Sequence, residues 1–245
     1  IDAIVVTVTI SLGILIGKIL KMDRSIALLT ACGSAICGAA AVMGVDGAIR
    51  PKPYKTAVAV ATVIIFGTLS MFLYPILYRT GVFALPANQM GIFAGSTIHE
   101  VAHVVGACNA MGATVSNTAI IVKMIRVMML VPVLLVIAFF TAKDLAKRNQ
   151  GDEKKAKITI PWFAILFIVV AIFNSFHFLP QSVVNMLVTL DTILLAMAMA
   201  ALGLTTHVSA LKKAGAKPLL MALLLFVWLI VGGGAINLAI HALMA

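Results

Sequence analysis

Eight apolar segments, separated by short polar stretches, follow one another along the 245 residues. Each is close to the roughly 20 apolar residues with which a helix crosses the hydrocarbon core of a bilayer. They cover about residues 3–20, 30–48, 55–78, 91–111, 116–140, 159–178, 183–205 and 218–244. The pattern predicts an all-α, polytopic membrane protein with a single transmembrane domain over residues 1–245.

The segments 30–48 and 91–111 differ from the other six. They are rich in Gly, Ala, Ser and Cys and poor in the Leu and Ile that face lipid in an ordinary span. Small residues let helices approach closely, and glycine also weakens a helix and permits breaks. We therefore expect these two segments to be broken or tightly packed.

Composition and charge agree with a membrane protein. Hydrophobic residues make up 62% of the chain and charged residues 11%, against roughly 45–50% and about 25% in soluble domains. The net charge is +10, but the basic residues lie in short loops, as on the cytoplasmic side of membrane proteins. We therefore expect a multi-pass membrane protein that contacts the lipid bilayer and binds no nucleic acid. The sequence is compatible with a homo-oligomer and with a monomer.

The basic loops also predict how the two unusual segments cross. Lys21 precedes the segment 30–48 and Lys52 follows it, so both of its ends are expected inside. The basic run at 143–157 places the far end of 116–140 inside, and both ends of 91–111 then lie outside. Each segment would enter and return without crossing, from opposite faces. The inside face is further marked by Lys18, Arg24, Arg50, Lys55, Lys154, Lys155, Lys157, Lys212 and Lys213.

An internal similarity supports this topology. The stretches Gly33–Gly38 and Gly95–Glu100 share the pattern Gly-Ser-x-Ile. With opposite entry, the similarity predicts an inverted repeat, as in many secondary transporters, with residues 1–85 ending the first repeat and 86–245 forming the second. The alternative is two unrelated packing helices.

Polar groups inside the apolar segments indicate an anion site. Broken segments from opposite faces would bring helix N-termini together, and Ser34 and Ser96 are suited to cap them. Lys123 and Arg126 lie three residues apart, on one face of the segment 116–140. Such charges are costly in a membrane unless they are paired or line a polar cavity. The alternative is a structural ion pair of Glu100 with either cation.

Other residues suggest ion coupling and buried thiols. Asp191 is an acid in the segment 183–205, where it would carry a coupling proton, bind Na⁺ or pair with a neighbouring helix. Cys32, Cys37 and Cys108 all lie in apolar segments, so we expect buried reduced thiols without disulfides.

The stretch His99-Glu100-Val101-Ala102-His103 matches the zinc-protease pattern H-E-x-x-H. On a helix, His99 and His103 would share a face and the glutamate would act as general base. An intramembrane zinc protease is therefore the alternative function. It needs a third ligand, and the one Asp-Gly pair, Asp46-Gly47, precedes the motif.

Specific stretches of the chain resemble the YeiH family, whose members are named as sulfate exporters. The resemblance runs in order through ACGSAICGAAAV, FGTLSMFLYP, GIFAGSTIHEVAHVVGA, VKMIRVMMLVPV, MAMAALGL and GAKPLL. It implies an inverted-repeat carrier similar to sodium/proton antiporters and bile-acid symporters. It also implies that the chain is the C-terminal two-thirds or more of a member, which agrees with an opening that lacks Met.

The resemblance implies a location in the bacterial inner membrane and, together with the polar groups described above, gives the candidate residues. The family usually has Gln where this chain has His103, which weakens the protease hypothesis. We expect no enzyme and no cofactor, a small anionic substrate such as sulfate, an organic sulfonate or a carboxylate, and H⁺ or Na⁺ as coupling ion. The candidate substrate-binding residues are Gly33, Ser34, Ile36, Cys37, Gly38, Ser96, Thr97, Lys123 and Arg126. The candidate ion-coupling residues are His99, Glu100 and Asp191, and His99 and His103 would bind metal only in the alternative.

Overall fold

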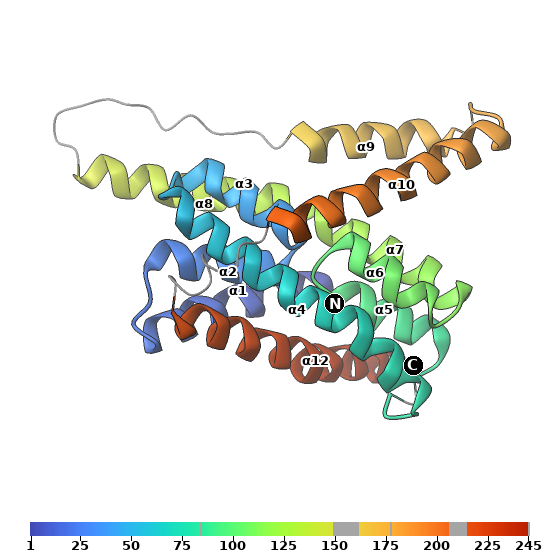
Figure 1. Cartoon of the computed structure of the whole chain (residues 1–245), viewed down its shortest axis with the longest axis horizontal. Helices are drawn as coiled ribbons and strands as arrows, with labels where there is room; N and C mark the ends of the chain where they lie inside the picture. The colour runs from blue at the N-terminus through green and yellow to red at the C-terminus, as the bar shows by residue number, and fades with distance from the viewer. Residues whose placement is uncertain (84, 149–161, 177, 206–214, 245) are drawn as a thin grey trace.

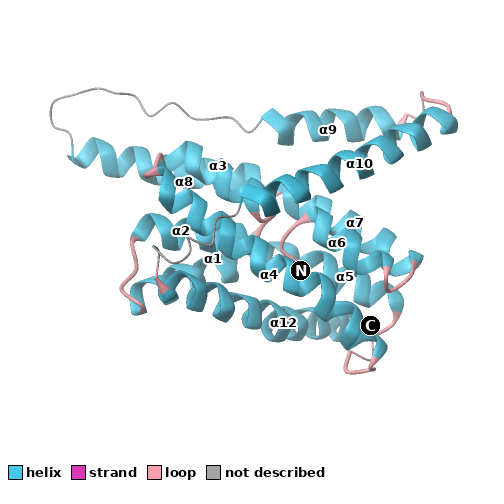
Figure 2. Ribbon diagram, in the orientation of Figure 1, coloured by secondary structure: helices cyan, strands magenta, loops and turns pink. Residues whose placement is uncertain are grey.

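The computed structural model describes residues 1–83, 85–148, 162–176, 178–205 and 215–244, and in these ranges it is helical throughout (Figures 1 and 2). Among the described residues, four stretches are long and apolar enough to cross a membrane: Asp2–Ile19, Pro53–Arg79, Ala113–Phe140 and Ala216–Leu243. The helices are α1 (Asp2–Ile19), α2 (Arg24–Ala35), α3 (Ala39–Ile49), α4 (Pro53–Arg79), α5 (Ala87–Thr97), α6 (Val101–Asn109), α7 (Ala113–Met128), α8 (Leu130–Arg148), α9 (Trp162–Ser175), α10 (Gln181–Thr205) and α12 (Ala216–Met244).

The two small-residue segments are both broken, as their glycine content predicts. The first divides into α2 and α3 at residues 36–38, and the second divides into α5 and α6 at residues 98–100. Gly38 precedes α3 with φ of 66°, a backbone conformation that glycine adopts without steric cost. The breaks fall at equivalent positions of the Gly-Ser-x-Ile pattern, two residues after each serine.

In each broken segment, the first half-helix begins and the second half-helix ends at the same end of the molecule. Lys55, at the start of α4, bonds Asp23, the N-cap of α2, at 2.7 Å. At the other end of α4, Arg79 donates to the Ala110 carbonyl, directly after α6, at 2.8 Å. Because the 27 residues of α4 extend about 40 Å, the α2–α3 pair and the α5–α6 pair enter from opposite ends.

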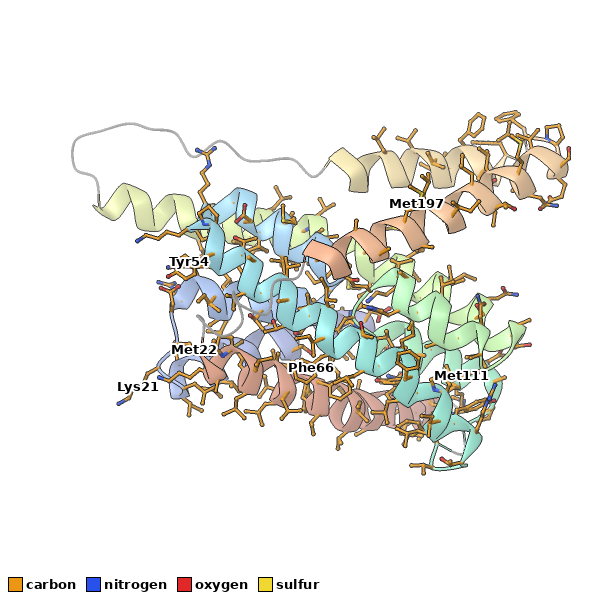
Figure 3. The ribbon with its side chains drawn as sticks, viewed as in Figure 1. Lys21, Met22, Tyr54, Phe66, Met111 and Met197 are labelled. Carbon is orange, nitrogen blue, oxygen red and sulfur yellow. The ribbon has the colours of Figure 1, made fainter. Side chains whose placement is uncertain are left out.

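The same arrangement is visible in Figure 3, where Lys21, Met22 and Tyr54 lie at one end and Met111 lies at the other. This is the entry predicted for the segments 30–48 and 91–111. Of the basic residues used in that prediction, Lys154, Lys155, Lys157, Lys212 and Lys213 lie outside the described residues.

Small residues let the half-helices pack closely on their neighbours. A Cβ at Gly13 of α1 would lie 2.5 Å from the Ala31 Cβ of α2, and one at Gly95 of α5 would lie 2.5 Å from the Ala119 carbonyl oxygen of α7. Both distances are far below van der Waals contact, so these positions accept only glycine without a shift. The expected free cysteines are confirmed, because all three are unpaired and buried.

Candidate functional site

The two breaks meet at Lys123, whose side chain is 0% exposed. Its ammonium donates to the carbonyl oxygens of Ile36 at 2.8 Å and Ile98 at 2.6 Å, which are equivalent positions of the two breaks. A third bond, of 2.7 Å, reaches the His99 carbonyl. A lysine ammonium has three N–H donors, so all three are used.

Arg126 lies one turn further along α7 and holds the ends of the same two half-helices. It is also 0% exposed. Its Nε donates to the Ala35 carbonyl at 2.6 Å, and its terminal nitrogens donate to the carbonyls of Ser34 and Ser96. The last carbonyls of a helix lack partners inside the helix and carry the negative end of its dipole. The two cations therefore satisfy the C-terminal ends of α2 and α5.

This geometry corrects the role predicted for Ser34 and Ser96. They are not N-caps, because each is the next-to-last residue of its helix, α2 or α5. The Ser96 hydroxyl donates to the Phe93 carbonyl within its own helix at 3.0 Å. The helix N-termini at the crossing belong to α3 and α6, and their N-cap positions are Gly38 and Glu100.

The alternative, an ion pair of Glu100 with Lys123 or Arg126, is not found among the described residues, where both cations bind carbonyl oxygens. The Glu100 carboxylate reaches across to the other broken segment instead. Its Oε1 accepts the backbone N–H of Ala39, the first residue of α3, at 2.8 Å. The residue is 7% exposed. Glu100 thus connects the two breaks through the N-terminus of α3.

The H-E-x-x-H pattern does not lie on one helix. α6 begins at Val101, so His99 and Glu100 belong to the break and only His103 is helical. The premise that His99 and His103 share a helix face is therefore wrong. Among the residues that the structure describes, no group of three His, Cys, Asp or Glu side chains lies close enough to hold a metal ion.

The two histidines have different surroundings. His103 places Nδ1 3.7 Å from Glu100 Oε2 and Nε2 3.4 Å from the Thr68 hydroxyl. His99 is buried with neither ring nitrogen hydrogen-bonded, and its ring lies 6.4 Å from that of Phe226. His103 therefore belongs to the polar cluster around Glu100, whereas the His99 ring packs toward α12.

The remaining predicted residues are divided between the crossing and the periphery. Ile36, Cys37 and Gly38 form the first break, and Gly33 packs closely in α2, where a Cβ would lie 2.7 Å from Val42. Thr97 accepts a 2.8 Å bond from the buried Tyr74 hydroxyl. Asp191, on α10, is exposed, and the structure does not bring it into the cluster.

Three residues of this region were not singled out from the sequence. Asn237 of α12 donates to the Ser96 hydroxyl at 3.1 Å. Tyr74 supplies the bond to Thr97. Asp2, the first residue of α1, is buried, and its Oδ1 has no hydrogen-bond partner. The signal that would have found Asn237 is the one that marked Lys123: a lone polar side chain within an apolar segment. Asp2 directly precedes the segment 3–20.

Known proteins similar to the chain are membrane proteins without an assigned activity. The profile of the family described as "Conserved hypothetical protein 698" matches residues 1–222. A "UPF0324 membrane protein" of Bacteroides thetaiotaomicron is 60% identical over 233 residues, which are 95% of this chain and 69% of that protein. The "UPF0324 inner membrane protein YeiH" of Escherichia coli is 58% identical over 246 residues, covering 100% of this chain and 70% of that protein.

The Salmonella typhi protein with the same description is 56% identical over 246 residues. No solved structure matches the chain. The resemblance to the YeiH family is thereby confirmed, and so is the inner-membrane location. The chain belongs to the UPF0324 family of multi-pass membrane proteins.

Proposed function

We propose that the protein is a secondary transporter that moves a small anion across the inner membrane by alternating access. One observation carries the proposal: two broken segments, which enter the molecule from opposite ends, meet at Lys123 and Arg126. Irregular backbone at membrane depth persists only where it is buried in protein or lines a cavity. In carriers, such breaks lie at the interface of inverted repeats and form the substrate site.

The pseudo-symmetry of the contacts supports an inverted-repeat core. Lys123 bonds the equivalent carbonyls of Ile36 and Ile98, and Arg126 bonds the equivalent carbonyls of Ser34 and Ser96. A single helix, α7, therefore binds both breaks through hydrogen bonds from its cations to backbone carbonyls. A movement of α7 relative to either hairpin would exchange these bonds and change the accessibility of the crossing.

The charge of the crossing favours an anion. The helix N-termini that the described residues place there, those of α3 and α6, present free N–H groups and a partial positive charge. One of them already binds a carboxylate, that of Glu100. Because both cations already donate to carbonyls, we assign the anion to the backbone N–H groups of α3 and α6. Lys123 and Arg126 would attract the anion electrostatically without bonding it directly.

The proposal is tested by thermal stabilisation of the intact purified protein across a panel of solutes. Sulfate, methanesulfonate and acetate are compared with the bulky anion gluconate at equal ionic strength, and with Na⁺ and a neutral sugar. A ligand at a hundred times its dissociation constant stabilises the folded state by about 2.7 kcal/mol. Stabilisation by one small anion above gluconate is expected. Stabilisation by a cation or a neutral solute alone would contradict the assignment of an anionic substrate.

A further inference from the structure

The N-terminus of α3 is shaped to hold a carboxylate. Glu100 Oε1 accepts the Ala39 N–H at 2.8 Å, and the residue before it, Gly38, has no side chain to obstruct the approach. A Cβ at Gly38 would lie 2.6 Å from Glu100 Oε1. The space beside this helix end therefore depends on glycine, and the group that fills it is an oxyanion.

The second oxygen of this carboxylate faces a histidine nitrogen that has no hydrogen-bond partner. His103 is 1% exposed, and its Nδ1 has no hydrogen-bond partner. That nitrogen lies 3.7 Å from Glu100 Oε2, beyond hydrogen-bond distance. A buried polar nitrogen without a partner is costly. Between α3 and His103, the Ala39 N–H therefore already donates to Glu100, whereas the His103 Nδ1 has no partner.

The charge of the crossing changes by one when Glu100 takes up a proton. Lys123 and Arg126 are buried cations there, and the two half-helix C-termini are offset by the N-termini of α3 and α6, of about half a charge each. Glu100 supplies a negative charge at the N-terminus of α3 while its carboxyl is ionised. Protonation removes that charge, and the binding of one monovalent anion restores it.

We propose that the Glu100 carboxylate occupies the site of the transported anion, and that a monovalent oxyanion replaces it at the N-terminus of α3 when Glu100 takes up one proton. This rests on the proposed function and deepens it. Glu100–COO⁻, one H⁺ and one anion become Glu100–COOH and a bound anion, with no other bond made or broken. Proton and anion are then carried together, and the substrate is of the sulfonate or carboxylate class.

The other titratable groups near Glu100 are Lys123, Cys37 and His103, with His99 next in sequence. Lys123 uses all its donors on carbonyls. Cys37 is a neutral thiol when reduced. His103 is the one neighbour placed to take the proton in place of Glu100, so the test must separate these two residues.

The experiment is calorimetric titration of the intact protein with methanesulfonate, in two buffers of different ionisation enthalpy and over a range of pH. Wild type is expected to take up about one proton per anion, with affinity falling about tenfold per pH unit wherever Glu100 is ionised. Glu100→Gln is expected to bind with no proton uptake and no pH dependence. His103→Gln separates the two candidate proton acceptors: its affinity for the anion is expected to fall, because His103 faces the site, but about one proton per anion should still be taken up.

Each outcome decides a different point. Binding by wild type without proton uptake overturns the inference and leaves an anion transporter. Proton uptake lost in His103→Gln and retained in Glu100→Gln also overturns it. Absence of binding by wild type at every pH removes the proposed anion function itself. If Glu100→Gln does not fold, Glu100→Asp replaces it, because a titrating carboxylate should preserve the proton uptake and shift its pH range.

Discussion

Replacing Lys123 by Met tests whether the buried ammonium holds the two broken helices together. Methionine keeps an unbranched side chain of similar length and removes three bonds, of 2.8, 2.6 and 2.7 Å, to backbone carbonyls. These carbonyls belong to Ile36, Ile98 and His99, which lie in the two breaks and outside the helices. The variant therefore leaves three buried acceptors without their donor while keeping the volume nearly unchanged.

The expected loss follows from these contacts. Each buried group left without its partner costs about 1–3 kcal/mol, while removal of the ammonium recovers part of its own desolvation cost. Removing one partner of a buried charged arrangement has a net cost of about 3–5 kcal/mol. At about 2–4 °C per kcal/mol for a chain of this size, Lys123→Met should lower the melting temperature by roughly 6–20 °C.

The assay uses the protein's own thiols. All three cysteines are free and buried, so a dye that fluoresces on reacting with thiols reports unfolding in detergent. Lys18→Met is the matched control, because Lys18 is exposed in the last turn of α1 and surface changes stay within about 0.5 kcal/mol. A Lys123→Met protein that melts together with this control would refute the claim that these bonds hold the crossing.

Three further predictions concern the same region. Tyr74→Phe removes the 2.8 Å buried bond to Thr97 and should cost about 1 kcal/mol in the same melt; an unchanged melting temperature would contradict it. Gly38→Ala forces a side chain into a backbone with φ of 66° and towards Glu100, so we expect a loss of about 1–3 kcal/mol and no stabilisation by anions. Cys37 is 5% exposed at the first break, so maleimide should label it slowly and should label it faster with substrate anion; an unchanged rate would argue against opening of the crossing.

The breaks and their directions of entry could be predicted because they rest on strong local signals. Gly33 and Gly95 mark small-residue segments, and the basic loops fix which ends share a face. The contacts of Lys55 with Asp23 and of Arg79 with Ala110 join the ends that the charges had placed together. Spans were found to within a few residues for α1, α4 and α12, since a long apolar run tolerates small errors at its ends.

The position of the serines within the half-helices could not be predicted. A serine hydroxyl caps a helix N-terminus or bonds a carbonyl one turn back within a helix, and the two uses look alike in sequence. Ser96 takes the second option by bonding the Phe93 carbonyl. The N-cap positions, Gly38 and Glu100, therefore lie four residues later than capping serines would place them.

The partners of the buried cations were hidden for a related reason. Residue types suggest a carboxylate as the partner of Lys123 and Arg126, and Glu100 is one candidate. Backbone carbonyls are equally good acceptors, but every residue has one, so no residue type marks them. Only the fold shows that the C-terminal ends of α2 and α5 converge on Lys123 and Arg126, while Glu100 binds the N-terminus of α3.

The most direct test of the account is uptake of a labelled monovalent sulfonate into proteoliposomes that contain the intact protein, with and without an inward proton gradient. We predict uptake above that of protein-free liposomes, accumulation driven by the gradient, and a Glu100→Gln variant that still exchanges anion across the membrane but no longer accumulates it. Flux no greater than in protein-free liposomes, for every small anion tried, would contradict the account.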